Sequence, residues 1–113
     1  MAVSGAYTVT GNTVKLTAAT SAPTPVQCPS VTLGGNQYRV INASTTQGCF
    51  LSFASDAATA TSNCVIPTAG NSTRTLYILP STDEVISFIP NAYFTAITSA
   101  NTADLYISPG DGM

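Results

Sequence analysis

The sequence has very little charge and lacks two residue types altogether. Only 7% of its 113 residues are charged, and it contains no histidine, no tryptophan and a single lysine, Lys15. Without histidine, the chain lacks the side chain most often used as a general base and a principal zinc ligand. Its three basic residues are too few for the basic surface that binds nucleic acid. The composition therefore disfavours most catalytic mechanisms and argues against a nucleic-acid partner.

Carboxylates are also scarce, and they do not form an evident catalytic pair. Asp83 and Glu84 are the only two that are adjacent in sequence, and neighbouring residues of a strand point to opposite faces. Following a Pro-Ser-Thr segment, they are typical of a solvated turn that opens a strand. No SxxK or GxSxG motif offers an activated serine. We predict that the protein is not an enzyme.

Cysteine occurs three times, at Cys28, Cys49 and Cys64. An odd number argues against a disulfide framework, and the spacing contains no CxxC motif. A zinc site would need all three thiolates and a ligand from another chain. We therefore expect the three cysteines to behave as small buried hydrophobic residues in strands, and we expect no metal and no cofactor.

Segments typical of a membrane span or a secretory signal are not found. The first residues, MAVSGAYTVTGNT, have neither a basic nor a hydrophobic region, so we expect the mature chain to start at Met1. The longest uncharged stretches, Leu16–Tyr38 and Val85–Ala103, are interrupted by proline, asparagine and hydroxyl residues. The length fits a single domain that buries about two-thirds of its unfolded surface. We expect no membrane partner.

Hydroxyl and apolar residues take the place of the missing charges. Serine and threonine occupy 30 of 113 positions, and hydrophobic residues make up 44%. With a net charge of −2, repulsion between copies is weak, so association is unopposed and we expect a homo-oligomer.

The apolar residues are largely β-branched or aromatic and recur in short runs between turn residues, which predicts an all-β antiparallel sandwich. A small barrel would give the same spacing. The candidate strands are Tyr7–Thr10, Thr13–Ala18, Gln37–Asn42, Cys49–Phe53, Asn63–Ile66, Thr75–Leu79, Val85–Ile89, Tyr93–Thr98 and Ala103–Ser108.

Alternation within these runs predicts which faces are buried. Cys49, Leu51 and Phe53 share one face, and Leu105 and Ile107 point inward while Asp104 is solvated. The Val85–Ile89 segment is apolar on both faces. It is therefore expected to be a central strand or a strand covered by a partner molecule.

The connections also carry predictions. Gly11-Asn12 predicts a tight hairpin between the first two strands. The proline-rich segment Pro23–Pro29 is expected to be a loop or an edge. Residues 56–61 (DAATAT) are the one place where a single helical turn is expected.

Six residues are candidates for a binding interface: Tyr38, Arg39, Tyr93, Tyr106, Pro109 and Met113. Tyrosine is amphipathic and common at interfaces, and arginine can pair with a carboxylate within the chain or across an interface, although an open-face position is the simpler interpretation. The terminal segments Met1–Ala6 and Pro109–Met113 are expected to be a flexible arm and tail, either of which could dock on a neighbour.

Four segments resemble a known class of proteins: QYRVIN, FLSFASDAATAT, LYILPSTDEVISFIPNAYFTAITS and LYISPGDGM. Together they are similar to small virion proteins of tailed bacteriophages, the decoration or cement proteins of the capsid. The resemblance runs from about Gln37 to the end of the sequence and includes no catalytic motif.

This resemblance implies a jelly-roll-like sandwich of eight or so short strands, made in the host cytoplasm and located on the capsid surface. The implied partner is a shell built of another protein, the major capsid protein. Our hypothesis is that the protein binds between its subunits as a symmetric trimer and stabilises the shell. The resemblance implies no particular site residue. A tail or fibre protein, or a carbohydrate-binding module that uses its tyrosines as stacking platforms, is the alternative.

Overall fold

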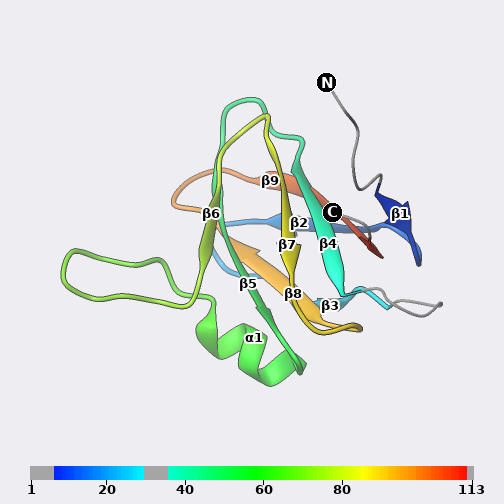
Figure 1. Ribbon diagram of the computed structural model, residues 1–113. Helices are drawn as coiled ribbons and strands as arrows, with labels where there is room; N and C mark the ends of the chain where they lie inside the picture. The colour runs from blue at the N-terminus through cyan, green and yellow to red at the C-terminus, as the bar shows by residue number, and fades with distance from the viewer. Residues whose placement is uncertain (1–6, 30–35, 112–113) are drawn as a thin grey trace.

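Two antiparallel sheets and one short helix make up residues 7–29 and 36–111, the part of the chain that the computed structural model describes (Figure 1). Sheet 1 contains β1 (Thr8–Val9), β2 (Val14–Ala18), β9 (Ala103–Asp111), β4 (Gln37–Asn42) and β7 (Asp83–Ser87). Sheet 2 contains β3 (Val26–Gln27), β8 (Tyr93–Ile97), β5 (Cys49–Ala54) and β6 (Leu76–Ile78). The helix α1 (Ala57–Asn63) follows β5. The prediction of an all-β sandwich is confirmed.

The strand pairing makes this sandwich a jelly roll. β2 pairs with β9, β3 with β8, β4 with β7 and β5 with β6, all antiparallel. The chain therefore folds as one long hairpin whose two arms remain paired as they roll up. Pairing of β4 with β9 and of β5 with β8 joins these ribbons into two sheets. This is the arrangement of a double-sheet jelly roll.

The core lies between the two sheets and is built from alternate residues of each strand. Leu105 and Ile107 of β9 are fully buried while Asp104 is not, as the alternation predicted. Cys49 and Leu51 of β5 also point inward, and Phe53 packs against the same core. Each fully buried aliphatic side chain stabilises the fold by about 2 kcal/mol. Since both sheets contribute, the core depends on their staying together.

The two long sides of the sandwich differ. On one side, Ala19 after β2 forms a bridge with Ile97 of β8, and the Thr98 amide donates to the Ala19 carbonyl at 2.9 Å. On the other side, β6 and β7 are the outermost strands of their sheets, and the described residues show no strand pairing between them. We call this second side, residues 74–89, the open edge.

Helix α1 covers part of the outer face of sheet 2. Its N-cap is Asp56, whose carboxylate accepts a hydrogen bond from the Thr59 amide at 2.8 Å. On the sheet beneath, the Ser52 hydroxyl donates to the carbonyl of Ala60, a buried helix residue, at 2.8 Å. The helix predicted from residues 56–61 is thus confirmed, and it runs on to Asn63.

The predicted hairpin at Gly11-Asn12 is wrong. β1 and β2 do not pair with each other, because both run along the same edge of β9. Val9 lies opposite Gly110 and Val14 opposite Ile107, so residues 10–13 face only residues 108–109. The glycine and asparagine therefore form a bulge within a nearly continuous strand. A turn motif cannot show whether a third strand offers a better partner.

The predicted end of the last strand is also wrong, because Pro109, Gly110 and Asp111 belong to β9. Pro109 has no N–H, but the Thr10 amide still donates to its carbonyl at 3.0 Å. The proline therefore faces the bulge, where the ladder is already interrupted. Only the last two residues of the predicted tail, like the arm Met1–Ala6, lie outside the described residues.

Two smaller differences concern strand assignment. No strand forms at Asn63–Ile66, where the helix ends and a long loop begins. The proline-rich segment contains the short strand β3 at the edge of sheet 2, which fits the expected edge position.

We expect Tyr38→Phe to lower the free energy of unfolding by about 2 kcal/mol. The buried Tyr38 hydroxyl donates to the Ile89 carbonyl at 2.6 Å and accepts from the Ala92 amide at 3.1 Å, so its loss removes both bonds and leaves the buried Ala92 amide without this partner. Urea denaturation measures the change. Tyr77→Phe is the matched control, because the exposed Tyr77 hydroxyl has no hydrogen bond. Equal effects of the two substitutions would contradict this role.

Candidate binding surfaces

The outer face of sheet 1 is the broadest strand surface that the described elements leave uncovered. It presents alternate residues of four neighbouring strands, in which register pairs Lys15 with Tyr106, Tyr106 with Ile41 and Arg39 with Val85. The full set is Lys15, Thr17, Gln37, Arg39, Ile41, Asp83, Val85, Ser87, Asp104, Tyr106 and Ser108. All of these side chains are exposed or half-buried.

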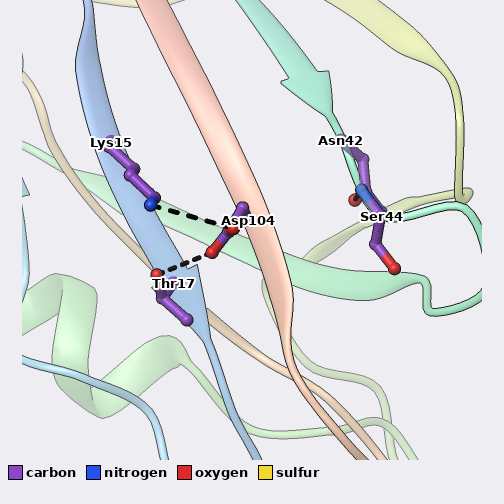
Figure 2. A network of polar contacts seen from close by, with 5 residues as sticks. All are labelled: Lys15, Thr17, Asn42, Ser44 and Asp104. Carbon is purple, nitrogen blue, oxygen red and sulfur yellow. Dashed lines mark hydrogen bonds and ion pairs between the residues drawn. The ribbon is translucent and has the colours of Figure 1, made fainter.

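Charges on this face are paired with each other. Lys15 Nζ lies 3.8 Å from a carboxylate oxygen of Asp104, and the Thr17 hydroxyl donates to Asp104 at 2.8 Å (Figure 2). Arg39 contacts Asp83 through Nη2 at 2.8 Å and donates from Nε at 2.9 Å. Because all four side chains are about half exposed, each pair adds little stability. Their effect is to leave the face with almost no net charge.

Tyr7 fixes the backbone of this face. Its hydroxyl accepts from the Arg39 amide at 3.1 Å and donates to the Ser108 carbonyl at 2.6 Å, so the phenol is inserted between two register partners of β4 and β9. The ring lies directly over Gly110, where an added Cβ would come within 2.4 Å of it and 2.5 Å of the Thr8 carbonyl. Glycine at position 110 therefore makes room for the tyrosine.

Asn42 organises the loop at one end of this sheet. Its buried side chain donates to the carbonyls of Gln47 and Ile78 and accepts from the Ser44 amide at 3.0 Å (Figure 2 shows Asn42 and Ser44). The loop between β4 and β5 is thereby tied to β6 in the opposite sheet.

A second surface lies at the open edge, where two shallow hollows adjoin. The first, of about 330 Å³ and called the polar hollow, is lined mostly by polar residues, and the second, of about 190 Å³ and called the apolar hollow, is lined mostly by apolar residues; Arg74 lines both. The polar hollow is lined by Ser62, Asn63, Val65, Ser72, Thr73 and Arg74. The apolar hollow is lined by Phe53, Arg74, Thr75, Leu76 and Phe88. Phe53 and Phe88 pack edge to face, with ring centroids 5.0 Å apart.

Two of the six predicted interface residues are core residues instead. Tyr38 is fully buried with its ring against Phe94, and Pro109 is buried within β9. The sequence pattern could not distinguish them from surface residues, because tyrosine is amphipathic and a proline rarely lies inside a strand. Met113 lies outside the described residues.

Of the other three predicted interface residues, only two lie on the same surface. Arg39 and Tyr106 share the outer face of sheet 1, and Arg39 pairs with a carboxylate of its own chain. Tyr93 is half-buried opposite Ala54, on the outer face of sheet 2. Arg74 and the hollows beside it were not predicted from the sequence. A signal existed in the Val85–Ile89 segment, whose apolar residues on both faces indicated a covered strand.

The three cysteines are buried free thiols, as expected, but only Cys49 lies in a strand: Cys28 follows β3 and Cys64 is the C-cap of α1. Burial raises the pKa of Cys28 and Cys49 to about 12 and that of Cys64 to about 11. Among residues 7–29 and 36–111, no group of three side chains is placed to hold a metal ion. The same part of the chain contains no helix long and apolar enough to span a membrane.

Comparison with known proteins adds no relative. No protein-family model matches the chain, and no curated protein or solved structure is significantly similar to it.

We expect the native thiols to react with a thiol reagent at pH 8 at least about a hundredfold more slowly than the same thiols in urea, because only the ionised, accessible form reacts. The measurement is absorbance after addition of a chromogenic disulfide. The variant Ser55→Cys, which places a thiol at an exposed position, controls for reagent activity. Fast labelling of any native thiol would contradict its burial.

We also expect the protein to lose stability at alkaline pH. Folding raises the pKa of each thiol above the unfolded value of about 8.5, so the native state retains protons that the unfolded chain releases. This contribution is complete below pH 8 and declines as pH rises toward the folded values. Urea denaturation at several pH values measures it, and Cys28→Ala should make the decline less steep.

Proposed function

We propose that the protein is a structural component of a bacteriophage virion, which binds to the capsid surface between subunits of the major capsid protein and stabilises the shell. The observation that carries the proposal is the jelly-roll pairing together with a wide, uncovered outer face on sheet 1. Double-sheet jelly rolls recur in viral capsid proteins and in lectins, so the fold supports this role by analogy. The phage segments that the sequence resembles support the same role.

The chemistry of the outer face of sheet 1 suits a flat protein partner. Lys15 and Arg39 already have carboxylate partners, so docking would not bury an unpaired charge. Tyr106 and Ile41 lie side by side near the middle of the face and provide apolar area. Threonine and serine around them supply hydroxyl groups that can donate or accept. A partner is recognised here by shape and hydrogen bonding more than by charge.

A carbohydrate-binding role has less support from this arrangement. It would require tyrosines exposed side by side, whereas Tyr38 is in the core and Tyr93 is half-buried on the opposite sheet from Tyr106.

The first test is the amount of this protein in density-gradient-purified particles, measured against the major capsid protein. A near-stoichiometric ratio supports the capsid role, and deletion of the gene should then lower the heat or osmotic tolerance of the particles. A few copies per particle would assign the protein to the tail or fibre. Its absence from particles would overturn the proposal.

We expect Ile41→Glu to weaken binding to particles from the deletion strain by about tenfold or more, because it places an unpaired charge in the centre of the proposed contact. Cosedimentation of purified protein with particles measures the affinity. Tyr93→Ala, on the outer face of sheet 2, is the control and should bind normally. If Tyr93→Ala abolished binding and Ile41→Glu did not, the contact would lie on the opposite sheet.

A further inference from the structure

β7 is an edge strand with one row of backbone groups unpaired. The Asn42 amide donates to the Thr82 carbonyl and the Phe88 amide to the Asn36 carbonyl, both at 2.9 Å, which fixes the alternation of the ladder. Residues 84 and 86 therefore bond to β4, and the N–H and C=O groups of Asp83, Val85 and Ser87 point away from it. In the described part of the chain, no strand pairs with this row.

Exposed apolar side chains are concentrated in the open edge, on β6, on β7 and just after each of these strands. Of seven large hydrophobic residues that are exposed, five belong to the open edge: Leu76, Tyr77, Leu79, Val85 and Ile89. β7 contains no lysine, proline or bulge; its two charged residues are Asp83, which is paired with Arg39 of the same chain, and Glu84, which would need a cation from a partner strand to be neutralised there. Both features favour an additional strand at this position.

The unpaired charges identify the partner. Among the charged side chains of residues 7–29 and 36–111, only Glu84 and Arg74 have no ion pair or hydrogen bond. Both lie at the open edge, with opposite signs. Glu84 is near the start of β7, whereas Arg74 lines the apolar hollow together with Phe88, just past the end of β7. An edge with opposite charges at its two ends is complementary to itself when one copy is reversed.

A two-fold axis at Val85 would pair both the outward-pointing backbone groups of β7 and the charges of Glu84 and Arg74. Antiparallel pairing of two β7 strands would place Val85 opposite Val85, and Asp83 opposite Ser87 of the second copy, so that the outward-pointing groups form the hydrogen bonds. Glu84 would lie opposite Ile86 of the second copy and diagonal to Phe88. Its carboxylate would then be within reach of Arg74, and the symmetry repeats this contact.

We propose that two copies of this chain associate through β7 as an antiparallel, two-fold dimer in which Glu84 of each copy pairs with Arg74 of the other. Sheet 1 of the two copies becomes one continuous sheet, and the outer face doubles in width. The dimer also covers Val85, which explains why a strand at the edge of a sheet has the apolar pattern of a covered one. A two-fold contact of this kind is an alternative to the trimer of our sequence-based hypothesis.

Sedimentation velocity of the purified full chain, from about 1 μM to about 1 mM, tests the dimer without any capsid, so its outcome is independent of the proposed function. Arg74→Glu and Glu84→Arg are each expected to weaken dimerisation by roughly tenfold, since each breaks two ion pairs and creates repulsion. The double variant should restore most of the affinity. Lys15→Glu, which makes the same charge change on the outer face of sheet 1, is the control and should dimerise normally.

Val85→Pro tests the backbone pairing separately. It removes an N–H that points away from β4, so the chain should keep its native circular dichroism and become monomeric. A chain that is monomeric over the whole range, forms a trimer, or dimerises despite Val85→Pro overturns the proposal. So does a double charge variant that is no tighter than either single variant.

Discussion

The hydroxyl of Tyr38 is the interaction on which the arrangement of the two sheets most depends. Tyr38 belongs to β4 in sheet 1, and its phenol bonds to the backbone on both sides of the turn that leads into β8 of sheet 2. Its ring packs edge to face on Phe94, with centroids 4.9 Å apart. One side chain thus sets the distance between the sheets and the position of a turn. In a chain with so few charges, buried neutral hydrogen bonds take the part that ion pairs have elsewhere.

The two sheets are connected by a backbone bridge on one side of the sandwich and only by side-chain packing on the other. This difference determines where the exposed apolar residues and the paired charges lie. The bridge between Ala19 and Ile97 connects the sheets where β2 passes beside β8. At the open edge, side chains alone fill the gap, chiefly Phe53 against Phe88. The interior is therefore closest to solvent where the unpaired strands lie. The same asymmetry places the exposed apolar residues on one side of the molecule and the paired charges on the broad face of sheet 1.

Local sequence patterns predicted which residues form strands, and which of them point inward, better than they predicted which strands pair. Alternation identified the inward residues of β5 and β9, because one face of each strand packs on the core. The Gly11-Asn12 motif failed, since both flanking strands find a better partner in β9, which comes about ninety residues later in the sequence. The Ser-Pro-Gly motif predicts that the last strand ends before Pro109, yet the proline is tolerated within β9 because a bulge lies opposite.

Prediction of the surface from sequence was weaker for a related reason. A tyrosine in a strand can face either way, and only the register shows that Tyr38 points into the core while Tyr106 points outward. Nothing in the local sequence indicated a binding role for Arg74, which lies in a loop of small polar residues. Its significance depends on proximity to Phe88, which is a property of the fold and not of the local sequence.

The pairing of β1 with the end of β9 makes the topology nearly circular. Thr8 and Asp111 are register partners, so the backbone of these two residues, near the two ends of the described chain, is separated by about 5 Å. A short peptide linker could join these ends and new termini could be opened in the exposed loop at residues 67–72 without breaking a strand. The order of strands along the gene is thus only one of several that this architecture accepts.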